Sequence, residues 1–374
     1  MKSTKSIFRI TTETTAMPLY NSIDSKVLKA NLAAEPFTRK TISFYRYFIL
    51  DHPQEFRDQL YREWADLNCF GRIYIAREGI NAQMSVPENH FEAFLQSLKN
   101  HPIFDGIPIK YAIEDNGKSF YKLSVKVRPK LVADGLDDDA FDVTNVGNHL
   151  SAKEFHDLVE TGEHIVVDMR NHYESEIGHF RGAICPEVDT FREELSVIAE
   201  MLEKQKNHKL LLYCTGGIRC EKASAYLKHR GFEDVNQLHG GILEYARNIK
   251  LLNLESNFIG KNFVFDERMG ESVNGEVISH CHQCGKPCDA HLNCANELCH
   301  LLFIQCSECA GKFEKCCSSE CRDLKNGSET VKQSHKVNDN FKFGNSRVYR
   351  KSFRLVKNSN FADPDLVSGQ KPTV

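Results

Sequence analysis

The stretch LLLYCTGGIRCEKASAYL, residues 210–227, changes character within a few positions. An apolar run ends at Cys214, and two glycines and Arg219 follow as a helical pattern begins near Ile218. Short apolar runs bounded by turn residues are typical of strands buried on both faces. In an open α/β sheet, the loop after such a strand carries the ligand site. The stretch therefore predicts a buried strand, a functional loop and a helix, with a thiol at the strand's carboxyl end.

The same alternation extends to both sides of this stretch, over residues 140–255. Ser151 and Glu154 form a capping-box pattern that opens a helix. The runs HIVVDMR and DVNQL indicate further short strands between helices. Short apolar strands separated by helices are typical of a parallel sheet covered on both faces. We expect residues 140–255 to form a parallel-sheet α/β domain.

A different order of elements precedes it, over residues 41–135. TISFYRYFIL alternates as a strand does, and PQEFRDQLYREWADLN has helical spacing. GRIYIAREGINAQMSV offers two strands, PENHFEAFLQSLKNH a second helix, and IPIKYAIED and SFYKLSVKVRPKLV close the unit. The order β-α-β-β-α-β is that of the ferredoxin-like α+β sandwich, to which acylphosphatase-like domains belong. Residues 1–40 are predicted to be a polar, net basic extension.

The composition of the whole chain is that of a globular protein. Its 374 residues suggest two or three domains, at about 150 residues each, in an α/β multidomain protein. There is no apolar run of about 18 residues, and the first residues lack the apolar core of a secretory signal. We therefore expect a cytoplasmic protein without a membrane partner. Its 14 cysteines are then thiols, metal ligands or catalytic groups before they are disulfides.

Ten of the cysteines crowd into a module that spans residues 260–325. Two Cys-x2-Cys pairs have the spacing at which two thiolates bind one tetrahedral zinc ion. The module has enough ligands for two closed zinc sites, which would stabilise a segment with few apolar residues. An iron–sulfur cluster, which would offer an electron source, is the alternative. The candidate ligands are Cys281, Cys284, Cys288, Cys294, Cys299, Cys306, Cys309, Cys316, Cys317 and Cys321.

The loop after the strand suits an anion or a reactive sulfur. The thiol of Cys214 is expected over unpaired amide donors at a helix N-terminus, which favour a thiolate, a persulfide or an oxyanion and lower a cysteine's pKa. Gly216 and Gly217 let the backbone curl around the sulfur, and Arg219 is expected to add a positive fork. Cysteine-arginine phosphatases use Cys-x5-Arg, so the tighter Cys214-x4-Arg219 disfavours a phosphatase. The alternative is a buried structural cysteine before a glycine turn.

Three segments, VVDMRNHYESEIGHFRGAI, YCTGGIRC and LHGGILEYA, together resemble the rhodanese domain over residues 145–250. Asp168 and Arg170 match its strand-end Asp-x-Arg, and residues 178–183 match its Gly-His-(Ile/Phe)-x-Gly-Ala turn. REGINAQMS, KVRPKLV, TFREE, FVFDER and the cysteine-rich module extend the likeness over residues 40–325. The chain thereby resembles one rhodanese-containing family, the oxygen-dependent tRNA uridine hydroxylases, which help convert the wobble uridine of certain tRNAs to 5-hydroxyuridine.

This resemblance implies an RNA-modifying oxidoreductase with tRNA as its partner and molecular oxygen as co-substrate. Cys214 would be the covalent sulfur centre, and Cys220 would resolve it by thiol exchange; packing inside the helix is the alternative for Cys220. No GxGxxG fingerprint marks a flavin or nicotinamide site, and no feature identifies an electron donor or an oligomeric state. The predicted catalytic residues are Cys214, Cys220 and Arg219, and the predicted active-site loop residues are Thr215, Gly216, Gly217, Ile218, Asp168 and Arg170.

Four cations in the first domain are candidate RNA contacts. Arg77 precedes EGIN, and Lys126, Arg128 and Lys130 alternate along one expected strand. Cations on one face would position phosphates without reading sequence. The alternative is a solvated edge strand, on which lysines prevent edge-to-edge pairing. The basic tail, residues 326–374, interleaves aromatic and basic residues in KFGNSRVYRKSFRLVK, which suits single-stranded RNA or a strand laid on the core.

Three functions compete at this point. The leading prediction is hydroxylation of the wobble uridine of tRNA. A rhodanese-type sulfurtransferase, which passes persulfide sulfur to a tRNA or protein acceptor, is second. A non-catalytic adaptor for RNA or protein is third, and the intact loop from Cys214 to Arg219 argues against it.

Overall fold

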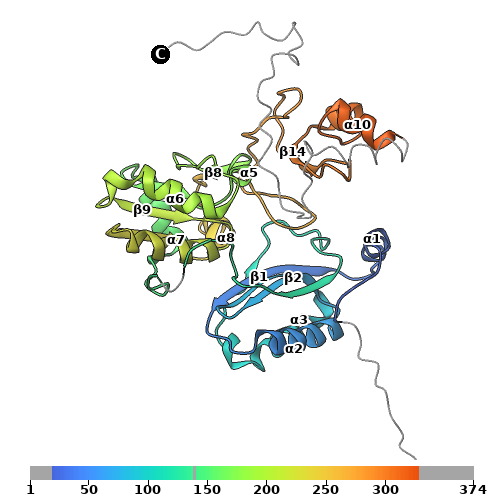
Figure 1. The fold of residues 1–374 in the computed structure, drawn as a ribbon, viewed down its shortest axis with the longest axis horizontal. Coiled ribbons are helices and arrows are strands. Elements are labelled where there is room, and N and C mark those ends of the chain that lie inside the picture. Colours follow the sequence, from blue (N-terminus) through green and yellow to red (C-terminus); the bar gives the residue numbers. More distant parts are fainter. Residues whose placement is uncertain (1–18, 138–139, 328–374) are drawn as a thin grey trace, which may run out of the picture.

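The computed structural model describes residues 19–137 and 140–327, which form three units in the order that the sequence predicts (Figure 1). Residues 1–18 of the extension and residues 328–374 of the basic tail lie outside the described residues. In Figure 1 the first unit lies below, with its helices α2 (Pro53–Asp66) and α3 (Phe91–Lys99) turned away from the other two units. The central and C-terminal units lie on the opposite side of its sheet.

The first unit has five strands in the order β4-β1-β3-β2-β5. This is the ferredoxin-like order with one strand added, because β5 pairs in parallel with β2 at the edge. Ile42 and Phe44 of β1 pack against α2 and α3, while the intervening Ser43 and Tyr45 face the other side. The elements are α1 (Ser25–Ala33), β1 (Arg39–Tyr47), α2 (Pro53–Asp66), β2 (Phe70–Ala76), β3 (Gly79–Pro87), α3 (Phe91–Lys99), β4 (Lys110–Tyr111) and β5 (Leu123–Val127).

The central unit is a parallel sheet in the order β6-β10-β9-β7. Leu210 and Leu212 of β9 pack with α6 and α7, whereas Leu211 and Tyr213 pack with α4 and α8. The predicted sheet with both faces covered is confirmed, as is the capping box at Ser151. The elements are β6 (Asn148–Leu150), α4 (Ala152–Glu160), β7 (Ile165–Asp168), α5 (His172–Ser175), β8 (Gly178–Phe180), α6 (Phe191–Met201), β9 (Lys209–Tyr213), α7 (Ile218–His229), β10 (Asp234–Leu238) and α8 (Gly241–Leu251).

The C-terminal unit is joined to the central one through a small antiparallel sheet, β12-β11-β8. Its own core is made largely of cysteines, with Leu301 and Phe303 among them. The elements are β11 (Phe258–Asn262), β12 (Glu271–Ser272), β13 (His291–Asn293), β14 (Leu302–Ile304), α9 (Ser307–Lys312) and α10 (Ser319–Asn326).

Polar contacts tie the three units together. Glu78, in the turn between β2 and β3, forms an ion pair of 2.7 Å with the buried Lys222 of α7. Arg72 of β2 donates a hydrogen bond to the carbonyl of Phe265, in the segment between β11 and β12. The segments REGIN and FVFDER therefore serve as contacts between units.

Candidate active site

Cys214 directly follows β9, and α7 begins four residues later at Ile218, as the sequence predicts. The thiol is buried, and the Gly217 N–H donates a hydrogen bond to Sγ at 3.1 Å. Gly217 has a φ of 98°, which glycine adopts without strain. The Cys214 carbonyl accepts a hydrogen bond of 3.0 Å from the Ile242 N–H at the start of α8. Two helix N-termini therefore hold the loop around the sulfur.

The two thiols of this loop have opposite proton preferences. Burial alone would raise the pKa of Cys214, but a hydrogen bond from Cys220, the charge of Arg219 and the loop amides lower it to about 6. Cys220 is fully buried, and burial and the neighbouring Cys214 raise its pKa well above the usual range. Cys214 is therefore a thiolate near neutral pH, with a protonated thiol beside it. This pair is chemically suited to thiol exchange.

Arg219 is not the free positive fork that its position suggests. Its guanidinium donates two hydrogen bonds to the carboxylate of Glu174 on α5, at 2.6 and 2.8 Å, and Glu174 is fully buried. Thr215 Oγ1 lies 3.5 Å from both side chains. The carboxylate offsets part of the positive charge that Arg219 presents to an anion in the loop.

Asp168 and Arg170 form a second buried ion pair, at the end of β7, with an N–O distance of 2.7 Å. The Tyr213 hydroxyl donates to Asp168 at 2.7 Å, and Arg170 donates to the Gly178 carbonyl at 2.6 Å. These contacts connect β7, β8 and β9. Both residues support the strand ends from within the core, and neither side chain is exposed to a ligand.

A buried acid that residue patterns alone did not single out also lies near the sulfur. Glu194, in the first turn of α6, is fully buried, and neither of its carboxyl oxygens has a hydrogen-bond partner among the described residues. Burial raises its pKa well above the usual range, although the charge of Arg219 acts in the opposite direction. Glu194 is therefore a neutral carboxylic acid close to Arg219 and Cys214. The segment TFREE contains it, but its spacing gives no sign of this environment.

The first unit covers the loop with two side chains that sequence reasoning missed. The Tyr45 hydroxyl donates to Glu221 of α7 at 3.0 Å, and it lies 2.8 Å from where a Cβ on Gly217 would be. Lys110 of β4 places its ammonium group 4.3 Å from the centre of the Tyr45 ring. Both residues come from a domain more than 100 residues away from Cys214 in the sequence, so no local motif could identify them.

Beside these side chains, a cavity of about 500 Å³ separates the first and central units. Ligand pockets of roughly 300–1,000 Å³ are typical for small molecules, and a nucleotide is of that size class. His149 forms a 3.0 Å ion pair with Glu221 at the cavity wall, and this contact raises the pKa of the His149 imidazole. The wall thus combines aromatic rings with groups that can form hydrogen bonds with a base; it includes Tyr45, Lys110, His149, Glu221 and His239.

The predicted RNA contacts separate into two groups. Arg77, Lys126 and Arg128 are exposed, at the edge formed by β2 and β5. The strand ends at Val127, so Arg128 and Lys130 do not continue its alternation as expected. Lys130 forms a 2.8 Å ion pair with Asp134, four residues on. Its charge is thereby already balanced within the chain.

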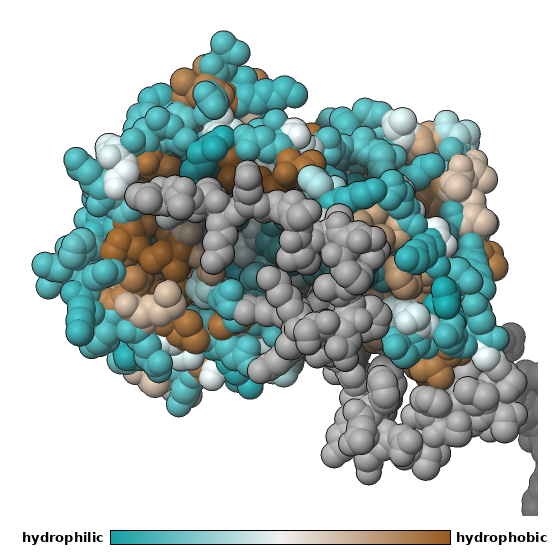
Figure 2. Space-filling model, turned by 90° about the horizontal axis from the view of Figure 1, so that it is seen from above, coloured by the Kyte–Doolittle hydropathy of each residue, from teal (hydrophilic) through white to brown (hydrophobic). Residues whose placement is uncertain are grey.

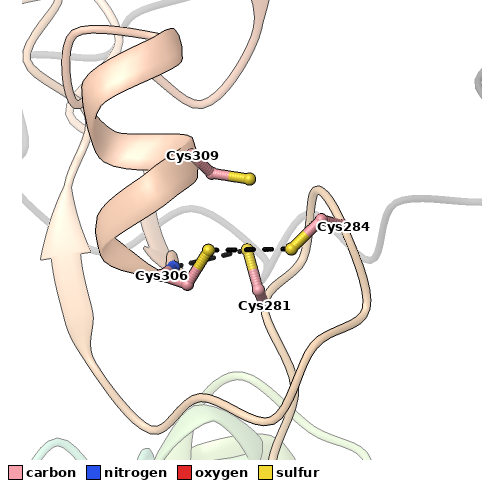
Figure 3. Close-up of side chains that lie close together, drawn as sticks. All are labelled: Cys281, Cys284, Cys306 and Cys309. Atoms are coloured by element: carbon pink, nitrogen blue, oxygen red, sulfur yellow. Dashed lines mark hydrogen bonds between the residues drawn. The ribbon is translucent and has the colours of Figure 1, made fainter.

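The cysteine-rich module holds two groups of four thiols, and within each group the sulfur atoms lie within 4.8 Å of one another. Figure 3 shows the first group, in which Cys281 and Cys284 come from a loop and Cys306 and Cys309 from the start of α9. The cysteines of the two groups alternate in pairs along the chain. Each group therefore joins two segments that flank a pair of cysteines from the other group. The second group consists of Cys294, Cys299, Cys317 and Cys321.

The donor set fits zinc. Four thiolates at about 2.3 Å from a tetrahedral ion lie roughly 3.8 Å apart, and the Cys284–Cys306 and Cys299–Cys317 sulfur distances are 3.6 and 3.7 Å. In each group a backbone N–H donates a hydrogen bond to one sulfur, and such hydrogen bonds orient and stabilise metal-bound thiolates. The ten predicted ligands do not all fall into these groups. Cys288 and Cys316 lie outside both groups, and the Cys316 thiol instead points at the Glu314 carbonyl.

The described part of the chain contains no helix that is both long and apolar enough to cross a membrane. Figure 2 shows a face whose coloured surface is mostly hydrophilic, with hydrophobic patches between.

Comparison with known proteins assigns all three units. The UPF0176 acylphosphatase like domain matches residues 39–131, the Rhodanese-like domain residues 151–248, and the Rhodanase C-terminal domain residues 259–322. Among solved structures, a rhodanese-like domain from Anabaena sp. covers 31% of this chain and 80% of its own, with 19% identity and a TM-score of 0.25.

Curated relatives extend over most of the chain and share one name. The tRNA uridine(34) hydroxylase of Leptospira interrogans is 55% identical over 92% of this chain and 95% of its own length. The proteins of that name from Hamiltonella defensa and Yersinia pestis are 54% and 53% identical, each over 82% of this chain and 86% of their own length. The chain therefore belongs to the tRNA uridine(34) hydroxylase family.

Proposed function

We propose that this protein hydroxylates uridine 34 of tRNA and uses Cys214 as its reactive sulfur. The observation that carries the proposal is a thiol with a pKa of about 6, placed where the central unit meets the first. The name shared by relatives at 53–55% identity favours hydroxylation over the sulfur transfer that a rhodanese loop alone would suggest. Since tRNA is the substrate, we place the protein in the cytoplasm.

The two cysteines can supply the electrons that hydroxylation needs. When molecular oxygen is the co-substrate, one oxygen atom enters the base at carbon 5 and the other leaves as water, which takes up two electrons and two protons. Oxidation of Cys214 and Cys220 to a disulfide releases two electrons, and an external thiol can then reduce that disulfide by exchange. The low pKa of Cys214 and the raised pKa of Cys220 support this division between an attacking thiolate and a resolving thiol.

The exposed cations of the first unit are proposed to hold the tRNA backbone. Arg77, Lys126 and Arg128 lie on one edge of the sheet, and Arg128 also rests on the Tyr74 ring at 5.3 Å from its centre. Such contacts are largely independent of sequence and weaken as salt rises. Lys130 is the weakest of the four predicted contacts because Asp134 already pairs with it.

The zinc sites are proposed to be structural. Each group supplies four thiolates, so a bound ion would have no open position for a substrate or for water. Because the two groups alternate along the chain, the ions would cross-link β13, β14, α9 and α10 in a module whose core is mostly sulfur.

Nucleoside mass spectrometry tests the proposed function directly. Transfer RNA from cells that lack this gene should lose 5-hydroxyuridine derivatives, and the wild-type gene should restore them. Cys214→Ser should restore nothing, and Cys220→Ser should restore little. Cys185→Ser is the matched control, because burial keeps the pKa of that thiol near 12 and it lies outside the loop. Intact hydroxylation together with loss of a thiolated nucleoside would assign the protein to sulfur transfer instead.

A further inference from the structure

Lys110 is a buried cation that forms no ion pair with a carboxylate among the described residues. It lies on β4, opposite Ser43 of β1, and is 4% exposed. Within the described residues, no carboxylate lies within 4.0 Å of its ammonium group, whereas the similarly buried Lys222 pairs with Glu78. The contact that its ammonium group makes is with the face of the Tyr45 ring. An unpaired buried ammonium is costly, so its retention at this place calls for a functional explanation.

The side chain of Lys110 crosses the Cys214 loop. Its Cδ lies 4.0 Å from the position that a Cβ would take on Gly216, and its Cε lies 3.6 Å from that position on Gly240. Gly216 follows Cys214 by two residues, and Gly240 precedes α8, whose first amides hold the loop. The lysine stem therefore lies between the two glycines, with its charged end over the active-site loop.

Two cations lie near the sulfur, and they differ in their partners. Arg219 is paired with the carboxylate of Glu174, and Glu194 is an uncharged acid. Burial lowers the pKa of Lys110 to about 8, and the negative charges of Cys214, Glu244 and Glu221 act in the opposite direction. Several titratable groups from the surrounding elements lie near the sulfur or near the cations beside it. They are Tyr45 of β1, Lys110 of β4, Glu174 of α5, Glu194 of α6, Arg219, Cys220 and Glu221 of α7, and Glu244 of α8.

We propose that Lys110 is the charge-compensating residue of the active site, supplied by the first unit to stabilise the anionic sulfur of Cys214. It adds to the charge of Arg219, which is shared with Glu174. Two consequences follow from its place in the fold. The reactivity of Cys214 depends on the first unit being docked against the loop. A substrate in the 500 Å³ cavity, which Lys110 also lines, meets this cation next to the sulfur.

The proposal is tested by the pH dependence of Cys214 alkylation, measured on the purified full-length protein with iodoacetamide and peptide mass spectrometry. This measurement does not involve tRNA. The role of Lys110 can therefore be wrong while the proposed hydroxylase function is right, and the hydroxylase function can be wrong while the role of Lys110 is right. Wild type should show a midpoint near pH 6. Lys110→Gln should raise the midpoint by about one to three units, because an opposite charge nearby lowers a pKa by that amount. At pH 6 this corresponds to at least a several-fold slower reaction.

Two further variants keep the test decisive. Lys40→Gln is the matched control, since Lys40 lies on the helix-covered face of the same sheet and packs on Phe91, and it should leave the midpoint unchanged. Lys110→Arg preserves the charge and should keep the low midpoint, while abolishing any second inflection near pH 8. Lys110→Arg also tests the proposal if Lys110→Gln fails to fold. A midpoint that stays near pH 6 in a folded Lys110→Gln variant, or an inflection near pH 8 that persists in Lys110→Arg, would overturn the proposal.

Discussion

Replacing Glu174 by glutamine removes the charge that neutralises Arg219 while preserving the shape of the side chain. The glutamine oxygen can still accept the 3.1 Å hydrogen bond from the Asn171 N–H that begins α5. The guanidinium of Arg219, 9% exposed, loses a carboxylate that it contacts at 2.6 and 2.8 Å. Leaving a buried charge without its partner costs about 3–5 kcal/mol. The free energy of unfolding of the central unit should fall by about that amount.

The same substitution should change the chemistry of the neighbouring sulfur. Arg219 is one of the groups that lower the pKa of Cys214, and without Glu174 its positive charge is no longer balanced. A stronger positive charge favours the thiolate, so the alkylation midpoint of Cys214 should move below pH 6 in Glu174→Gln. Removal of the cation in Arg219→Met should move it above pH 6.

Both effects can be measured in one set of variants. Hydrogen exchange of β9 peptides reports the opening of the central unit by itself. Tryptophan fluorescence would report on the first unit instead, because the single tryptophan, Trp64, lies there. The double variant Glu174→Gln/Arg219→Met should recover much of the lost stability, because an apolar side chain then replaces the stranded charge. Glu163→Gln, at an exposed site, is the control. A loss below about 1 kcal/mol in Glu174→Gln, or a midpoint that does not fall, would refute the reasoning about this pair.

Three further predictions concern the other parts of the molecule. Gly217→Ala should slow Cys214 alkylation and weaken docking of the first unit, because a Cβ there would lie 2.8 Å from the Tyr45 hydroxyl and the φ of 98° disfavours alanine. Limited proteolysis between the units should become faster, and an unchanged digestion pattern would contradict this prediction. Elemental analysis should find two zinc ions per chain in the wild type, one in Cys281→Ser and two in Cys288→Ser. Equal losses of zinc in both variants would exclude the four-thiol assignment. Lys126→Gln/Arg128→Gln should weaken tRNA binding and reduce the salt slope by about two, and an unchanged slope would remove this edge from the interface.

Much of the fold of the first two units could be predicted because its signals are local. The alternation of Ile42 and Phe44 with polar neighbours shows one covered face of the first sheet, and the unbroken apolar run of β9 shows a sheet covered on both faces. Ser151 and Glu154 lie three residues apart, so the capping box was readable directly. The position of Cys214 between β9 and α7 also follows from adjacent residues alone.

The electrostatics of the site could not be predicted in the same way, because the partners are remote in sequence. Glu174 precedes Arg219 by 45 residues, and nothing in the loop motif shows that its arginine is already paired. Cys288 and Cys316 resemble ligands by composition, but only folding of β13, β14 and α9 decides which thiols converge. Lys130 is the exception, because its partner Asp134 stands only four residues on in the sequence.

The three-unit architecture explains why the loop chemistry belongs to the assembled chain rather than to the central unit alone. Within the central unit, Cys214 has loop amides and an arginine that is shared with Glu174. The first unit adds an aromatic ring and an ammonium group over the loop, and the C-terminal segment brings the Phe265 ring to 6.0 Å from the Arg219 guanidinium. The cavity also exists only between units. A substrate held there touches two units at once, so binding can couple their docking to the reactivity of the sulfur.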